Sequence, residues 1–207
     1  MKTALKREIT SGRILDAAYR AIAARGWGAV TLREIAEESG VALSQLSYYF
    51  GNKDGLFAAV LDRMQREYAE NLAVKLRDAT SLRERLERLI DYNRLLLKEN
   101  TDLYRNFLEF FNFAMASPEF KKQVTAFLTG IARAIEEQIT QKQKSNQKLA
   151  SYSSSAVTHF ILSASFGISL QHLLAPKNKD VEAGFDVIKT ALGIVFSADS
   201  KDVTRTG

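Results

Sequence analysis

Hydrophobic residues recur at three- and four-residue steps along most of the chain, which is the period of an α-helix. The first such stripe holds Ile14, Ala18 and Ile22 and stops at Gly26, a residue that accepts the positive φ common at a helix end. No segment shows the two-residue alternation typical of a strand. The pattern therefore predicts an all-α protein with nine helices, three short ones followed by six longer ones.

Capping residues and breaks in the pattern predict the other helix ends. Thr31 and Glu34 have the spacing of a capping box, Gly40 ends this second helix, and a third helix follows over 42–49. Asn52 is placed to cap the fourth helix, and Pro118 falls in a first helical turn, where proline is tolerated. The longer helices are predicted at 52–77, 80–99, 102–115, 117–144, 155–174 and 181–198, with a polar loop near 141–155 and a frayed tail after 199.

The segment 31–53, TLREIAEESGVALSQLSYYFGNK, is organised as two short helices joined by a tight turn. Ala36 is small enough for the helices to cross closely, and Gly40 permits the turn between them. Apolar residues at 35, 41, 46 and 50 form one side, and polar residues lie mainly on the other. This is the arrangement of a helix-turn-helix, whose outward face can enter a DNA major groove. A short helical hairpin without a DNA role is the alternative.

The head of the chain resembles the DNA-binding domain of the TetR family over residues 14–57, ILDAAYRAIAARGWGAVTLREIAEESGVALSQLSYYFGNKDGLF. The resemblance implies three helices for DNA binding, about four around a ligand cavity, and two that form a homodimeric four-helix bundle. It divides the chain into a helix-turn-helix DNA-binding domain at 1–53 and a ligand-binding and dimerisation domain at 54–207.

The resemblance also implies which side chains contact DNA. Arg33 is expected to contact DNA from the second helix, while positions 43, 44, 45 and 47 read bases and positions 48, 49 and 53 hold phosphates. The predicted DNA-binding residues are Thr31, Arg33, Leu43, Ser44, Gln45, Ser47, Tyr48, Tyr49 and Lys53. This chain departs from the family pattern at Ala42, which replaces a capping serine, at Ser47, which replaces a tyrosine, and at Tyr49, where histidine is frequent.

The segment 103–115, LYRNFLEFFNFAM, is rich in aromatic residues. It is interpreted either as one wall of an apolar effector cavity, with Asn106, Glu109 or Asn112 as polar anchors, or as ordinary core packing. The resemblance favours a cavity for an unknown small, largely apolar effector. The residues predicted to bind it are Tyr68, Tyr92, Phe107, Phe110, Phe111, Asn112 and Phe127.

The eighth predicted helix is apolar around much of its circumference, and the ninth carries apolar residues at three- and four-residue steps. A helix of the first kind must be buried on more than one side. These two helices are predicted to form an isologous homodimer interface, with closure of the monomer's own core as the alternative. The predicted interface residues are Phe166, Gly167, Leu170, Phe185, Ile188, Leu192 and Phe196.

Composition and charge narrow the classes of function. The chain of 207 residues has a formal net charge of +5 and no cysteine, which excludes disulfides and thiolate chemistry. Residues 1–53 hold 8 basic and 5 acidic side chains, so the positive charge is denser in the head, as a polyanionic partner would favour. No secretory signal is recognised and no apolar run is judged to approach the length of a membrane span, so a cytoplasmic protein without membrane contact is expected.

No catalytic residue, metal site or cofactor is predicted. His159 and His172 lie thirteen residues apart on one predicted helix, about 20 Å along its axis, and cannot share a metal ion. The chain is therefore predicted to be no enzyme. The predicted function is a ligand-responsive transcriptional regulator, most often a repressor, that binds a palindromic double-stranded DNA operator as a homodimer and is released by its effector. A helical enzyme and an interaction module without DNA binding are the alternatives.

Overall fold

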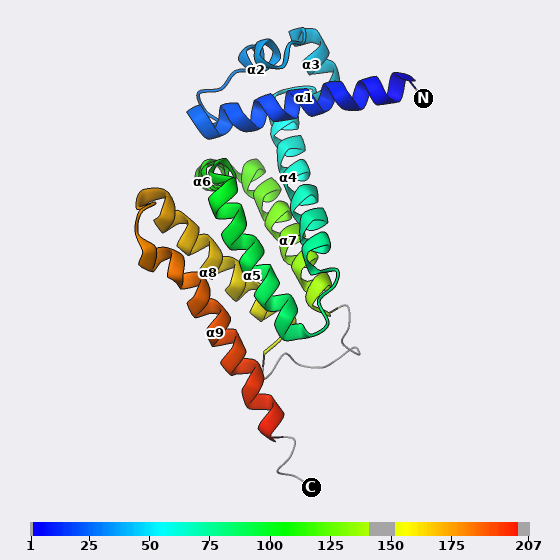
Figure 1. Cartoon of the computed structure of the whole chain (residues 1–207). Helices are drawn as coiled ribbons and strands as arrows, with labels where there is room; N and C mark the ends of the chain where they lie inside the picture. Colours follow the sequence, from blue (N-terminus) through cyan, green and yellow to red (C-terminus); the bar gives the residue numbers. More distant parts are fainter. Residues whose placement is uncertain (1, 141–151, 203–207) are drawn as a thin grey trace. The chain divides into compact units, whose positions relative to one another are not determined.

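The computed structural model describes residues 2–140 and 152–202, with side chains placed over 5–140 and 152–194. Nine α-helices account for nearly all of these residues (Figure 1), which confirms the predicted all-α class. The helices are α1 (Lys2–Arg25), α2 (Leu32–Ser39), α3 (Leu43–Phe50), α4 (Lys53–Leu76), α5 (Leu82–Glu99), α6 (Thr101–Ala116), α7 (Pro118–Thr140), α8 (Ser154–Leu174) and α9 (Lys179–Asp202).

Within the described residues, the observed helix ends lie within two residues of the predicted ones except at the start of α1 and the end of α9. Helix α1 begins at Lys2, well before the apolar stripe that starts at Ile14. Helix α9 begins at Lys179 and continues to Asp202, so the described part of the tail predicted to fray after 199 is helical. The predicted end of the seventh helix at 144 and most of the predicted loop over 141–155 lie outside the described residues.

The chain divides into two compact units. Unit 1 comprises residues 1–66 and 102–128, and unit 2 comprises residues 67–101 and 129–207, so α4 and α7 each contribute to both. The resemblance implies a boundary after residue 53 between two functional domains, which is a different division from that into two compact units. The functional boundary stays a prediction.

In unit 1, α1 packs against both short helices, α2 and α3. The core beneath them centres on Phe57 of α4, whose side chain is fully buried. Three rings surround it, with centroids 5.0 Å away at Trp27, 4.9 Å at Phe110 and 4.7 Å at Phe120. Aromatic burial therefore joins α4, α6 and α7 of this unit to the turn that follows α1.

The ends of the short helices have the predicted caps. The Thr31 hydroxyl accepts a hydrogen bond from the Glu34 amide while the Glu34 carboxylate accepts from the Thr31 amide, which completes the capping box. Gly40 ends α2 with φ of +67°, and Gly26 follows α1 with φ of +80°. Ala42 at the start of α3 makes no side-chain cap bond, as its apolar side chain requires. The turn geometry of the head thus follows from local sequence.

In unit 2, α5, α8 and α9 pack against one another. Gly184 of α9 lies so close to α8 that an added Cβ would stand 3.0 Å from the Ile168 Cδ1 atom. Ion pairs line the α5–α9 contact, joining Arg94 to Asp186 at 2.6 Å and Lys98 to Glu182 at 2.5 Å. Surface pairs of this kind contribute little stability each, so apolar burial holds these helices together.

Helix α8 is long and apolar enough, by length and composition, to cross a membrane. The expectation that no apolar run approaches this length is therefore wrong. Only 28% of its apolar window is buried within the chain. Exposed apolar surface on a helix commonly marks an interaction site, and one such helix alone is weak support for a membrane span.

A pH-dependent contribution to stability arises at the start of α5. The Thr80 amide and hydroxyl donate to one oxygen of Glu84 at 2.8 and 3.0 Å, and Arg88 donates to the other at 2.6 Å. The bond from the Thr80 amide is the largest of the causes that lower the pKa of Glu84 from 4.5 to about 2. Because the folded pKa lies below the unfolded one, this stabilisation is complete above pH 4.5 and is lost as the pH falls toward 2.

Substitution of Glu84 by glutamine is accordingly expected to lower the melting temperature at neutral pH. The difference from the unchanged protein should shrink steadily once the pH falls below 4.5, the ordinary pKa of the group. Thermal melts followed by circular dichroism at a series of pH values measure this. A difference that keeps its size at low pH would show that Glu84 acts through something other than its charge.

Candidate DNA-binding surface

Helix α3 has one buried and one exposed side. Leu46 is fully buried against the rest of the head, while Leu43 and Ser44, in the first turn of the helix, are exposed. Tyr48 has 74% of its surface exposed, and its ring meets that of Tyr49 edge-on at 5.6 Å. Gln45 and Ser47 are partly exposed between them. The structure thus brings the residues predicted on α3 together on one helix that leaves them open to a partner.

The two predicted DNA contacts near α2 have different surroundings. The Thr31 hydroxyl donates to the Glu34 carboxylate at 2.8 Å and accepts from the Glu34 amide, so it already serves the capping box. The hydrogen bond from the Thr31 amide is the main reason why the pKa of Glu34 lies below its usual range. Arg33 is exposed on the first turn of the same helix. Of the two, Arg33 has the freer side chain for a phosphate.

Lys53, the predicted phosphate ligand at the start of α4, is held by the turn after α1. Its Nζ atom donates to the Trp27 carbonyl oxygen at 2.6 Å and lies 4.7 Å from the centre of the Trp27 ring. Partial burial lowers the pKa of this lysine. An ammonium group has three N–H donors. One is used here, so the geometry fixes the side chain while leaving two donors for another acceptor.

Two polar residues of α6 bind the same part of the head. A Glu109 carboxylate oxygen accepts from the Trp27 amide at 3.1 Å, and the Asn106 side-chain amide donates to the Tyr19 carbonyl oxygen at 3.1 Å. Both side chains therefore bind main-chain atoms of unit 1, and their interpretation as effector anchors stays a prediction. These partners are more than eighty residues apart in sequence, and no local pattern indicates them.

Of the residues predicted to bind an effector, five belong to unit 1 and two belong to unit 2. In unit 1, the rings of Phe107 and Phe127 lie 5.5 Å apart, and Phe110 packs against Phe57 in the core. Phe111 is partly exposed, and Asn112 is exposed. In unit 2, the rings of Tyr68 and Tyr92 lie 5.4 Å apart, and the Tyr68 hydroxyl donates to the Asn93 side-chain oxygen at 3.1 Å. Their role in effector binding stays a prediction.

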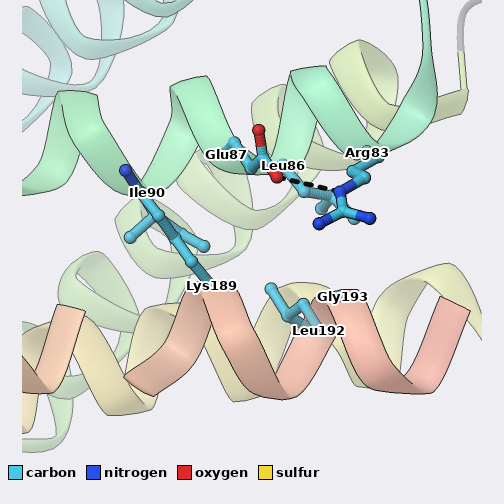
Figure 2. A pocket seen from close by; sticks show the side chains of 7 residues that line it. All are labelled: Arg83, Leu86, Glu87, Ile90, Lys189, Leu192 and Gly193. Carbon is cyan, nitrogen blue, oxygen red and sulfur yellow. Dashed lines mark hydrogen bonds and ion pairs between the residues drawn. The ribbon is translucent and has the colours of Figure 1, made fainter. Parts of the chain in front are cut away.

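A narrow cleft lies between α5 and α9 of unit 2 (Figure 2). Ile90 on α5 and Leu192 on α9 point toward one another across it, and Arg83 pairs with Glu87 at 3.0 Å on its α5 side. None of the residues predicted to bind an effector lines this cleft.

The residues predicted for the dimer interface occupy two environments within unit 2. Phe185, Ile188 and Leu192 of α9 are at most 6% exposed, because they pack inward, with Arg94 of α5 placed 5.6 Å from the Phe185 ring centre. Phe166, Gly167 and Leu170 of α8 are partly exposed, and the side chain of Phe196 lies outside the described residues.

The most exposed of the described apolar residues of α8 and α9 are not the residues predicted for the dimer interface. Val187 is 67% exposed and Leu174 is 89% exposed. Val187 lies seven residues before Ile194 on α9, and Leu174 lies seven residues after Gly167 on α8, so each pair shares one side of its helix. We define the α8–α9 face as exposed Phe160 and Leu174 of α8 with the partly exposed Gly167 between them, together with exposed Val187 and Ile194 of α9. An added Cβ at Gly167 would meet nothing within 4 Å. The seven-residue spacing of these positions can be read from the sequence, and it is the signal that could have identified this set.

Comparisons with known proteins agree with this geometry. The sequence profile described as "Bacterial regulatory proteins, tetR family" matches residues 14–60. The HTH-type transcriptional regulator BetI of Brucella abortus is 25% identical over 188 residues, which cover 89% of this chain and 90% of BetI.

Two solved structures share the fold. The transcriptional regulator FadR of Bacillus subtilis, solved with stearoyl-CoA, is 18% identical with a TM-score of 0.70, covering 87% of this chain and 96% of its own. A transcriptional regulator of Saccharomonospora viridis, solved with choline, is 20% identical with a TM-score of 0.69, covering 92% and 96%.

The profile match covers the helix-turn-helix, and the BetI relative and the two structures extend the likeness to most of the chain. The exposed α3 and its capped partner α2 both lie within the residues that the profile matches. Residues 14–60 therefore match the TetR family of bacterial regulatory proteins, and most of the chain is similar to an HTH-type transcriptional regulator.

Proposed function

We propose that this regulator binds a palindromic DNA operator as a homodimer and is released from it by a small-molecule effector, as a repressor is. The observation that carries the proposal is the head of unit 1, in which a fully buried Leu46 anchors α3 and leaves its polar side open. The chain is accordingly a cytoplasmic DNA-binding protein and no enzyme.

Helix α3 is proposed to lie in the major groove. Leu43 suits the methyl group of a thymine, whereas Gln45 suits the hydrogen-bonding edge of an adenine. Ser44 and Ser47 are short enough to let the helix approach the base edges. Phosphates are assigned to Arg33, Tyr48, Tyr49 and Lys53, whose donors lie at or beside the two short helices.

A second copy of the chain is proposed to cover the α8–α9 face. Helix α8 contains no aspartate, glutamate, lysine or arginine between Ser154 and Leu174, and most of its apolar window is uncovered within the chain. A large uncharged apolar surface is unfavourable in water and is typical of an obligate interface. The absence of a side chain at Gly167 would allow a partner helix to approach closely.

The effector is proposed to be a small, largely apolar molecule. The two solved relatives hold stearoyl-CoA and choline, which are chemically unlike each other, so this fold accepts ligands of different classes. In unit 2, the rings of Tyr68 and Tyr92 pack together, and the Tyr68 hydroxyl binds the side chain of Asn93, which is buried and uncharged. Asn93 in turn donates to the buried Ser165 hydroxyl at 3.3 Å. Phe107, Phe110, Phe111, Asn112 and Phe127 remain the candidates in unit 1. An effector that binds one conformation better than others shifts the population toward it and can thereby weaken operator binding.

Selection from a random pool of duplexes tests the DNA-binding proposal. The unchanged protein is expected to enrich a palindrome whose half-sites are centred about 34 Å, one helical turn, apart or a multiple of it. Enrichment of no duplex would refute DNA binding.

A charged residue on the α8–α9 face tests the homodimer. Val187→Lys is expected to give monomers in sedimentation experiments and to weaken binding to the selected duplex by about 100-fold or more, because two linked heads bind far better than one. Met115→Lys is the matched control, since Met115 is 81% exposed on α6 of unit 1. A Val187→Lys protein that stays dimeric would refute this interface.

A further inference from the structure

The positive charge of the head lies outside its helix-turn-helix. Residues 14–53 are neutral, with basic Arg20, Arg25, Arg33 and Lys53 balanced by acidic Asp16, Glu34, Glu37 and Glu38. Residues 2–13 carry a net charge of +3, from Lys2, Lys6, Arg7 and Arg13 against Glu8. The whole excess of the head is therefore on the first turns of α1, before the region that the family profile matches.

Most cations of residues 14–53 already have a partner in the chain. Arg20 pairs with Glu38 at 3.2 Å, and Arg25 pairs with Glu34 at 3.1 Å. Lys53 is bound to the Trp27 carbonyl oxygen. Proteins gain most of their sequence-independent affinity for DNA by neutralising phosphates with free basic side chains. Residues 14–53 of this chain are therefore poor in basic side chains that have no partner within the protein.

Arg7, which belongs to the basic first turns of α1, lies beside two tyrosine rings of α3. Its guanidinium carbon lies 5.8 Å from the centre of the Tyr48 ring and 5.9 Å from that of Tyr49. Contacts of this kind are cation–π interactions, which use no hydrogen-bond acceptor, so the N–H groups of the guanidinium can still donate to another group. Arg7 is exposed, and among the described side chains no carboxylate pairs with it. Lys6 is exposed beside it.

We infer that Lys6 and Arg7 bind the phosphate backbone of the same duplex that α3 reads. The inference rests on the proposed function and extends its DNA surface from α3 onto the first turns of α1. Two features favour a duplex as the occupant: the charge is complementary to phosphate, and Arg7 touches Tyr48, which is itself assigned to the backbone. The guanidinium edge offers paired N–H groups that match two oxygens of one phosphate.

Titrations of labelled duplex at several salt concentrations test the inference. The probes are the duplex that the unchanged protein selects from a random pool and an unrelated duplex of the same length. Arg7→Ala is expected to weaken binding to both by roughly tenfold at 0.15 M salt and to reduce the slope of log K against log salt by about 2 per dimer, one phosphate for each protomer. Lys6→Ala should act in the same direction, and Arg7→Lys should restore most of the slope.

Lys121→Ala is the matched control, because it removes one exposed cation from α7 of the same unit. It is expected to leave the slope unchanged. If Arg7→Ala keeps the slope of the unchanged protein, or weakens only the selected duplex, then Arg7 orients the tyrosine rings without holding a phosphate, and the inference is wrong. If the unchanged protein binds neither duplex, the proposed function fails first. Melting curves establish that each variant is folded.

Discussion

Phe57→Ala is expected to lower the free energy of unfolding by about 3–5 kcal/mol, the range for removing a buried phenylalanine. The Phe57 side chain is fully buried, and three rings stand within 5.0 Å of its centre, on Trp27, Phe110 and Phe120. Alanine would leave a cavity bounded by ring atoms of separate helices, which cannot all move inward to fill it. Two of the lost contacts are edge-to-face pairs, which contribute beyond their buried area.

Urea unfolding followed by far-ultraviolet circular dichroism measures this loss. Phe57→Leu retains most of the volume and is expected to cost clearly less than Phe57→Ala. Met115→Ala removes a side chain that is 81% exposed and should stay within about 0.5 kcal/mol of the unchanged protein. A Phe57→Ala cost no larger than that of Met115→Ala would mean that the aromatic cluster does not stabilise unit 1.

Gly55→Ala is expected to cost about 3 kcal/mol, at the upper end for overpacking. An added Cβ at Gly55 would stand 2.1 Å from the Phe50 carbonyl oxygen, a main-chain atom at the end of α3. A side chain could rotate away from such a contact, but a carbonyl can move only with the backbone of the α3–α4 junction. The substitution should therefore also displace α3 and weaken binding to a selected duplex.

Gly12→Ala is the matched control for this steric reasoning. Gly12 lies in α1 of the same unit, and an added Cβ there would meet nothing within 4 Å. Since glycine is unfavourable inside a helix, this change is expected to stabilise the protein by about 0.5–1 kcal/mol. Urea unfolding of both variants gives the comparison, and equal effects of the two substitutions would show that the close approach at Gly55 has no energetic weight.

Local features of the head were predictable because their causes lie within a few residues of one another. The Thr31–Glu34 capping box, the positive φ of Gly26 and Gly40, and the missing cap at Ala42 depend on residue types at neighbouring positions. The same holds for Asn52, whose side-chain oxygen accepts from the Gly55 amide at 2.9 Å. Buried Leu46 and exposed Tyr48 follow from helical periodicity alone.

Contacts between distant segments were not predictable from such patterns. The Lys53 side chain gains its Trp27 partner, and Glu109 its main-chain amide, only after α1, α4 and α6 have packed. Periodicity also failed to separate the two sides of α9. It marked Phe185, Ile188 and Leu192 as apolar, but whether a helix of the same chain or a second copy covers a stripe depends on tertiary packing. Helix α1 was predicted too short because the exposed Leu5 and Ile9 give its first turns no buried stripe.

Trp27 has one further consequence, because it is the only tryptophan in the chain. It is buried in unit 1, beneath the Lys53 ammonium and against the Phe57 ring. Light absorbed selectively by indole therefore reports on unit 1, whereas far-ultraviolet circular dichroism sums the helices of both units. The chain thus carries a natural fluorophore at the turn that leads into α2 and α3, and comparison of the two optical signals reveals whether its two units unfold together.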